Sequence, residues 1–290
     1  MARNSISIAR LNAKTVSQLL LSLPILFSVV LGAGCRKGAI TGSPPPPANE
    51  NASSEKNNTA DKGDLKLSYQ PRKQAKASHT VGTNSQAIEQ VINNLNDRVA
   101  LPWDIVVSFE DCDAPDAFYD PDNHKLTLCY QLIDEYYDLF GRKIKDKTKL
   151  DEAVRGAMAS TFFHELGHGL VDAWKIPITG KEEDAVDQLS TLTLILRTDK
   201  GEAMALDSAI LFKLYADLDK GQPKILWDEH SLDEQRFYDT ICLVYGHDPG
   251  KYAYLVKDGT LPEERAGLCE EDYPKIANSW RQLLSPYIKH

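Results

Sequence analysis

Several features that define large classes of protein are missing or scarce in this sequence. Its 290 residues include five cysteines, none with CxxC spacing, and no internal repeat. A zinc site built from thiolates is therefore not expected. Positive charge is scarce over most of the chain, since residues 81–290 carry 22 basic and 38 acidic residues. Phosphate groups bind to positive surfaces, so we expect no nucleic-acid partner.

The overall composition is that of a globular protein. The chain is 42% hydrophobic and 26% charged, with a formal net charge of −9. Its length allows one large domain or two small ones and is sufficient to bury a sizeable core.

The first 34 residues have the order of a secretory signal. Three basic residues and no acid precede an apolar stretch, which ends in small residues before Cys35. Pro24 and Ser28 interrupt this stretch, which is short for a helix that spans a bilayer. Residues 31–35 resemble a bacterial lipobox, although Leu31 stands one place further from the cysteine than usual. The resemblance implies a signal peptide over residues 1–34, cleavage before Cys35 and lipidation of its thiol. Simple secretion is the alternative.

Residues 35–80 have the composition of a tether. Four consecutive prolines at positions 44–47 are followed by a stretch rich in Asn, Ser, Lys and Ala. We expect no fixed structure before about residue 80 and one domain over residues 81–290. Arg36 stands where an aspartate would resemble an inner-membrane retention signal. We therefore expect an outer-membrane lipoprotein that faces the periplasm and contacts the membrane through its lipid, with a periplasmic or secreted protein as the alternative.

Four cysteines remain if Cys35 is lipidated, and an oxidising compartment permits disulfides between them. Four cysteines allow three pairings. Proximity along the chain favours a Cys112–Cys129 bond across one hairpin and a Cys242–Cys269 bond between C-terminal helices.

Hydrophobic periodicity predicts a small sheet followed by helices, which makes the fold α+β with an antiparallel or mixed sheet packed on a helical bundle. A capping box of Ser231 and Glu234 marks the start of the last predicted helix. The expected strands cover residues 103–109, 117–119 and 125–130, and the expected helices cover residues 84–99, 151–174, 182–197, 201–218 and 231–245.

His164, Glu165 and His168 form the pattern His-Glu-Leu-Gly-His inside the predicted helix over residues 151–174. Four residues are slightly more than one helical turn, so both imidazoles project from one face and can share a metal ion. Glu165 lies beside them, where a carboxylate can accept a proton from a metal-bound water. This is the HExxH arrangement of zinc hydrolases. The residues before it are mostly apolar, which predicts a buried site where unpaired histidines would be costly. The sequence therefore predicts one zinc ion per chain.

The third zinc ligand is expected on the following helix. A histidine of the metzincin type would fall six residues after His168, where the chain has Trp174. Glu183 and Asp187 instead supply the gluzincin pattern of a glutamate followed four residues later by an aspartate. Glu183 would complete the metal site, and Asp187 would accept a hydrogen bond from a ligand histidine. Glu182 is the rival ligand, but it would place a valine where the orienting acid belongs.

His230 lies just before the last predicted helix. Gluzincins commonly place a His or Tyr opposite the metal, where it stabilises the oxyanion of the transition state. His230 is the first candidate for this catalytic role, followed by Tyr238 and Tyr245. The alternative is an exposed histidine near a helix cap.

Several of these segments resemble a bacterial metallopeptidase-like family of uncharacterised function. The resemblance covers roughly residues 81–275 and implies a compact, gluzincin-like catalytic domain. It implies no substrate, because the family is named from its motif. The segments that carry it are residues 117–121, 129–130, 164–168, 183–187 and 227–246.

The sequence as a whole predicts a zinc-dependent peptide-bond hydrolase of the bacterial envelope, in which Glu165 activates a zinc-bound water. An extended peptide or protein substrate would pair with an edge strand at residues 117–119 or 125–130. The alternative is a zinc-binding envelope protein that binds a peptide or other partner in the same cleft without hydrolysis. Glu165 argues against this alternative, because such a site needs no base. A structural zinc would need a fourth ligand, and no cysteine or further histidine lies at a suitable short spacing.

Overall fold

A computed structural model describes residues 61–73, 85–197 and 200–289. The predicted signal peptide, Cys35 and most of the predicted tether lie outside the described residues. Among the described helices, none is both long and apolar enough to cross a membrane. The elements are β1 (Leu65–Tyr69), α1 (Ser85–Asn96), β2 (Ile105–Glu110), β3 (Ala117–Asp120), β4 (Lys125–Cys129), α2 (Tyr130–Gly141), α3 (Lys147–Trp174), α4 (Glu182–Arg197), α5 (Gly201–Leu218), α6 (Asp233–His247), α7 (Tyr254–Lys257), α8 (Glu263–Leu284) and the 3₁₀ helix η2 (Ser285–Tyr287).

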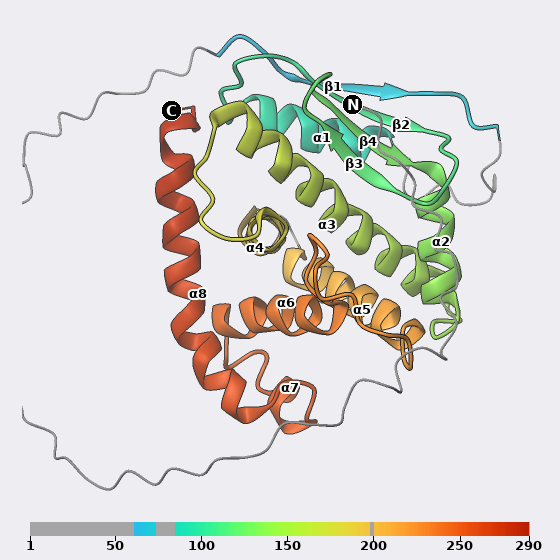
Figure 1. Cartoon of the computed structure of the whole chain (residues 1–290), viewed down its shortest axis with the longest axis vertical. Helices are drawn as coiled ribbons and strands as arrows, with labels where there is room; N and C mark the ends of the chain where they lie inside the picture. The colour runs from blue at the N-terminus through green and yellow to red at the C-terminus, as the bar shows by residue number, and fades with distance from the viewer. Residues whose placement is uncertain (1–60, 74–84, 198–199, 290) are drawn as a thin grey trace, which may run out of the picture. The chain divides into compact units, whose positions relative to one another are not determined.

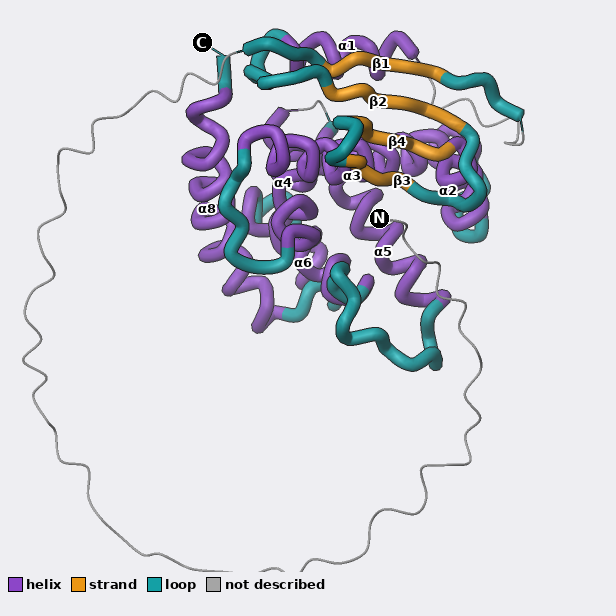
Figure 2. The backbone as a smooth tube through the Cα atoms, turned by 45° about the horizontal axis from the view of Figure 1, so that its top comes forward, coloured by secondary structure: helices purple, strands orange, loops and turns teal. Residues whose placement is uncertain are grey.

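The four strands form one mixed sheet in the order β1-β2-β4-β3, which confirms an α+β fold. β2 is parallel to both β1 and β4, whereas β3 runs antiparallel to β4. Figure 2 shows this order, with β1 at the edge of the sheet far from α5 and β3 at the opposite edge. Because β4 lies between two strands, of the two segments predicted to pair with a peptide only residues 117–119 lie on an edge strand.

β1 corrects the prediction that residues 35–80 have no fixed structure. Its five residues pair in register with β2, and Leu65 is only 4% exposed. The side chain of Asn96 accepts a hydrogen bond from the Leu65 amide (2.8 Å) and donates one to its carbonyl (3.1 Å), which ties β1 to the end of α1. The alternation of apolar and polar residues in β1 was present in the sequence but lies next to a stretch of tether-like composition.

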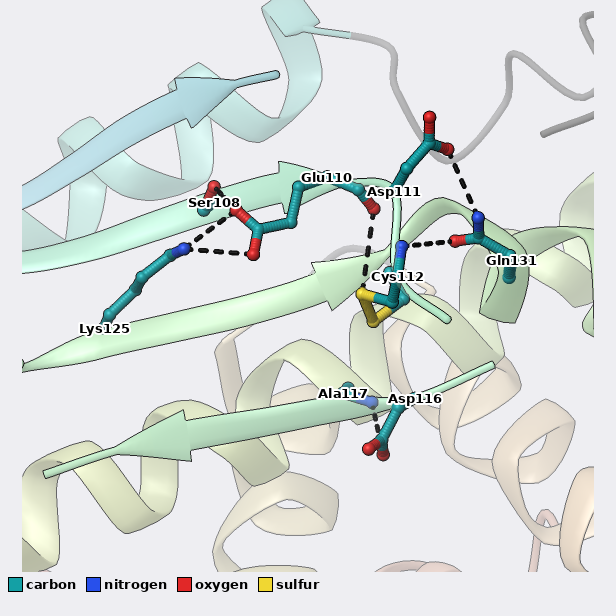
Figure 3. Close-up of a disulfide and its surroundings, with 9 residues drawn as sticks. Ser108, Glu110, Asp111, Cys112, Asp116, Ala117, Lys125 and Gln131 are labelled. Carbon is teal, nitrogen blue, oxygen red and sulfur yellow. Dashed lines mark hydrogen bonds and ion pairs between the residues drawn. A yellow bond between two sulfur atoms is a disulfide. The ribbon is translucent and has the colours of Figure 1, made fainter. Parts of the chain in front are cut away.

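Both predicted disulfides are present. Cys112 follows β2 and Cys129 ends β4, and these strands are parallel, so the bond joins two neighbouring strands and not the arms of one hairpin. Gln131 supports it from the start of α2, because its side chain accepts from the Cys112 amide (3.0 Å) and donates to Asp111 (3.3 Å) (Figure 3). The second disulfide ties α6 to α8.

Helix α3 lies at the centre of the fold, between the sheet and the helices α4 and α5 (Figure 1). It begins at Lys147, four residues before the predicted start, because the Asp146 side chain accepts a hydrogen bond from the Lys149 amide (2.9 Å). Two glycines let α3 approach its neighbours closely. A Cβ atom on Gly167 would lie 2.9 Å from Val186 on α4, and one on Gly169 would lie 3.3 Å from Tyr119 on β3.

Helices α4 and α5 occupy the predicted ranges, whereas α6 begins two residues later than predicted. The predicted capping box of Ser231 and Glu234 is wrong. Gln235 instead accepts a hydrogen bond through its side chain from the Leu232 amide (3.1 Å), and Glu234 forms an ion pair with Lys224 (2.6 Å).

Candidate metal centre

Three of the predicted ligands meet where α4 begins beside the middle of α3. Glu183 Oε2 lies 3.1 Å from His164 Nε2 and 3.4 Å from His168 Nε2. One ligand atom from each residue can be chosen so that all three lie within 4.8 Å of one another. Because Gly167 has no side chain, the backbone of α4 can pack against α3 at this point and bring Glu183 to the histidines.

The other ring nitrogen of each histidine faces a second carboxylate. His164 Nδ1 lies 2.7 Å from Asp187 Oδ1, and His168 Nδ1 lies 2.8 Å from Glu182 Oε1. An ionised carboxylate only accepts, so both Nδ1 atoms donate and both Nε2 atoms face Glu183. Glu182, the rival ligand in the sequence, thus lies on the outer side of His168, where it can fix the orientation of the ring.

Arg236 on α6 completes this arrangement and was not predicted. Its Nε donates to Asp187 Oδ2 (2.7 Å) and its Nη2 donates to Asp187 Oδ1 (2.9 Å). The guanidinium also lies over the ring of Phe212, 4.1 Å from its centroid. The bidentate geometry holds the Asp187 carboxylate in the orientation that receives the proton of His164 Nδ1.

The charges of the cluster are strongly coupled. Burial raises the pKa of Glu183, but its contacts with three histidines outweigh burial and hold this pKa far below its usual range. Burial lowers the pKa of His164, yet its contacts with Asp187 and Glu183 raise it overall to about 9. Two imidazole nitrogens and an ionised carboxylate are the donor set of a catalytic zinc site of the His₂Glu type. The residues therefore fit a divalent cation held by His164, His168 and Glu183.

His230 lies at the exposed side of the same cluster. Its Nε2 is 3.0 Å from Glu183 Oε2, and its side chain is 41% exposed. Lys181 donates to the carbonyls of Asp228 (3.0 Å) and His230 (3.2 Å), which ties this segment to the residue before α4. The structure therefore brings His230 to the predicted site. Tyr238 and Tyr245 do not line the pocket beside it.

Glu165 faces a pocket of about 360 Å³ that His164 and His230 also line. Its side chain is buried, at 8% exposure, and burial raises its pKa. Among the described residues, no hydrogen bond or ion pair to the Glu165 side chain is found. A buried carboxylate in this state is suited to exchange a proton with a molecule in the pocket.

A family model described as "Putative metallopeptidase" matches residues 69–284, which is well over half of the chain. The chain belongs to this family. Membership of this metallopeptidase family indicates a peptidase and implies a bound metal ion, for which His164, His168 and Glu183 form a suitable site. No curated protein and no solved structure matched the chain. The family match begins at the last residue of β1, before the predicted start of the domain at residue 81.

Little in the sequence could have shown that Arg236 belongs to the site. Asp187 and Arg236 are 49 residues apart and lie on different helices. Arg236 lies in the first turn of α6. From the sequence alone, an arginine at this place is expected to lie on the surface. Only the packing of α6 beside α4 identifies it as a partner of the site.

Proposed function

We propose that the chain is a zinc-dependent peptide hydrolase of the gluzincin type that acts in the bacterial envelope. His164, His168 and Glu183 hold the zinc, and Asp187 orients His164. The observation that carries the proposal is the convergence of both Nε2 atoms on Glu183 while both Nδ1 atoms face carboxylates. The envelope location and the lipid anchor at Cys35 are proposed from the N-terminal sequence alone.

A bound zinc ion lowers the pKa of water and polarises the carbonyl group of a substrate. Glu165 accepts the proton of the attacking water at its carboxylate and passes it to the amine that leaves. Its burial supports this role, since a raised pKa brings the carboxyl group closer to the pKa of the groups with which it exchanges the proton.

His230 stabilises the negative charge that develops on the carbonyl oxygen of the substrate. Its position beside Glu183 and its partial exposure at the pocket support this role. His230 and Glu183 also form a second possible ligand group with the exposed Glu229. A His230→Ala variant separates the two roles. If His230 binds the oxyanion, the variant keeps its zinc and loses kcat; if it is a ligand, the variant loses zinc.

The substrate peptide binds in extended form along β3. This strand is an edge of the sheet, and Ala117 at its start lines the pocket that contains Glu165. An edge strand offers unpaired backbone groups to an added strand.

Zinc content tests the proposed ligand set. The full chain, purified without chelator, is expected to contain one zinc ion, which is measured by atomic emission. Glu183→Ala should abolish or greatly weaken zinc binding, whereas Glu182→Ala should weaken it by less, because Glu182 only orients His168. The reverse result would make Glu182 the third ligand. The absence of zinc from the wild-type chain, even after reconstitution, would overturn the proposed function.

A further inference from the structure

The pocket beside the metal centre extends away from it to a second group of polar side chains. Tyr215 on α5 donates to Glu135 Oε2 on α2 at 2.7 Å, and both residues line the pocket. Asp116, before β3, also lines it. The pocket also has an apolar, buried wall made by Leu132, Leu211 and Phe212.

Of the acidic residues that line this pocket, Asp187 is paired with Arg236 and His164, whereas three others have no basic partner among the described residues. Among the described residues, no ion pair is found for Glu135, Asp116 or Glu165. Arg236 also lines the pocket, but its Nε and Nη2 both donate to Asp187. The buried Glu165 has no hydrogen-bonding partner among the described residues, so the pocket contains a carboxylate that only a bound molecule or water can satisfy.

We propose that this pocket binds a cationic group of the substrate, and that Glu135, held in place by Tyr215, determines specificity for lysine or arginine side chains. This inference rests on the proposed peptidase function and adds the substrate class. A lysine or arginine side chain combines an aliphatic stem with a charged end. The stem fits the apolar wall, and the charged end reaches Glu135, in which Tyr215 donates to Oε2 and leaves Oε1 available.

Binding of uncleaved peptides tests the proposal without depending on hydrolysis. The zinc-loaded Glu165→Gln chain is titrated with acetylated, amidated hexapeptides of Ala and Gly that carry arginine, citrulline or norleucine at one position in turn. Citrulline has nearly the shape of arginine but no charge. We expect arginine to bind at least about tenfold more tightly than citrulline at one position, as a charge-assisted hydrogen bond allows.

The same titration on the Glu135→Gln/Glu165→Gln chain should bring the ratio of arginine to citrulline affinity close to one. Asp138→Asn, on the same helix but outside the pocket, is the matched control and should leave the ratio unchanged. Asp116→Asn provides a second test at an exposed position if the change at Glu135 impairs folding, and it should reduce the ratio. A free-amine norleucine peptide that binds more tightly than its acetylated form would show that the cationic group is the peptide's α-amino group.

Equal affinity for arginine, citrulline and free-amine peptides at all positions would overturn the proposal, as would a preference that persists in the Glu135→Gln chain. Cleavage of the peptides by the wild-type chain is measured in parallel. If the wild-type chain cleaves peptides without a preference for charge, the proposed specificity is overturned and the proposed hydrolase function stands. If peptides bind in a charge-dependent way but are not cleaved, the proposed hydrolase function is overturned and the proposed subsite for a cationic group stands.

Discussion

Two groups of carboxylates lie on either side of the histidines of α3, and they differ in whether they are paired. On the α4 side, Glu182, Glu183 and Asp187 all contact a histidine, and Asp187 also binds Arg236. On the pocket side, no ion pair is found for Glu165, Glu135 or Asp116 among the described residues. Paired carboxylates are fixed in position, whereas unpaired ones remain available to a proton or a substrate.

The pKa values follow this division. Burial acts to raise the pKa of both Glu183 and Glu165, but only Glu183 has histidine contacts strong enough to reverse the effect. The difference shows that similar side chains within one site acquire opposite properties from their partners. The four predictions below test this difference, from the largest expected effect to the smallest.

Replacing the unpaired base Glu165 should strongly slow hydrolysis, while the proposed metal ligands keep their zinc. Glu165→Gln is expected to lower kcat by about 10²–10⁴-fold, because the amide cannot accept the proton of the attacking water. Peptide cleavage and zinc content are measured on the same preparation. Activity that persists in a zinc-loaded variant would contradict the role of Glu165.

Weakening the paired side should act on the metal. Asp187→Asn removes the charge that holds His164 and Arg236, so zinc affinity should fall by about 10–100-fold. Competition with a chromophoric chelator measures the affinity. Asp184→Asn, one helical turn earlier on α4, is the control. Equal zinc affinities in the two variants would show that Asp187 does not orient the ligand.

A fourth carboxyl group without an ion pair among the described residues lies outside the site. Burial, and then the charge of Glu152, raise the pKa of Asp207 on α5 to about 7. Between about pH 4 and 7 the folded chain therefore binds this proton more tightly than the unfolded chain, so its stability falls as the pH rises. Asp207→Asn should increase the free energy of unfolding at pH 8 by about 1–2 kcal/mol, allowing for partial exposure of the side chain.

The pH dependence provides the check on Asp207. Urea unfolding of both proteins should show the difference at pH 8 and its disappearance below about pH 4, where the aspartate is protonated in both states. A variant that is less stable than the wild type at pH 8 would show that the charged form of Asp207 is stabilised in the fold.

Glu110 is a paired carboxylate at the surface of the sheet. Away from the site, such an ion pair is expected to contribute little to the free energy of unfolding. Glu110 binds Lys125 (2.8 Å) and accepts from Ser108 (2.9 Å) (Figure 3). Burial raises its pKa, but these contacts outweigh burial and lower it overall. Glu110→Gln should cost about 0.5–1 kcal/mol at pH 7.

A lowered pKa contributes stability above the pKa of the unfolded chain, and this contribution is lost as the pH falls through the folded value. The Glu110→Gln difference should therefore begin to fall below about pH 4.5 and disappear as the pH falls through the lower folded pKa. Thermal unfolding at pH 7 and pH 3 measures it. A difference that stays constant between these pH values would assign the effect to packing.

The parts of the site that could be predicted from the sequence are those encoded within one or two helical turns. The spacing of His164 and His168 predicts that both lie on one face of a helix, and the spacing of Glu183 and Asp187 predicts the same for the next helix. The structure places these four side chains together. The disulfide pairing was also predicted correctly, although the hairpin from which Cys112–Cys129 was inferred does not exist.

The parts that were missed depend on contacts between distant segments. Tyr215 and Glu135 are 80 residues apart, and β1 is recognised as a strand only through its pairing with β2. Helix α2, which contributes Glu135, was not predicted because residues 130–141 follow a strand directly, without a cap from a side chain. Such contacts leave no periodic pattern in the sequence.

The close approach of α3 and α4 at Gly167 has a consequence for the thermodynamics of metal binding. The three proposed ligands stand on two helices that pack closely at Gly167, with no loop between a ligand and its helix. These side chains contact one another, Asp187 and Glu182 in the folded chain, so part of their conformational entropy is lost on folding. Association of the ion then has a small ordering cost, which is the advantage of a preorganised receptor.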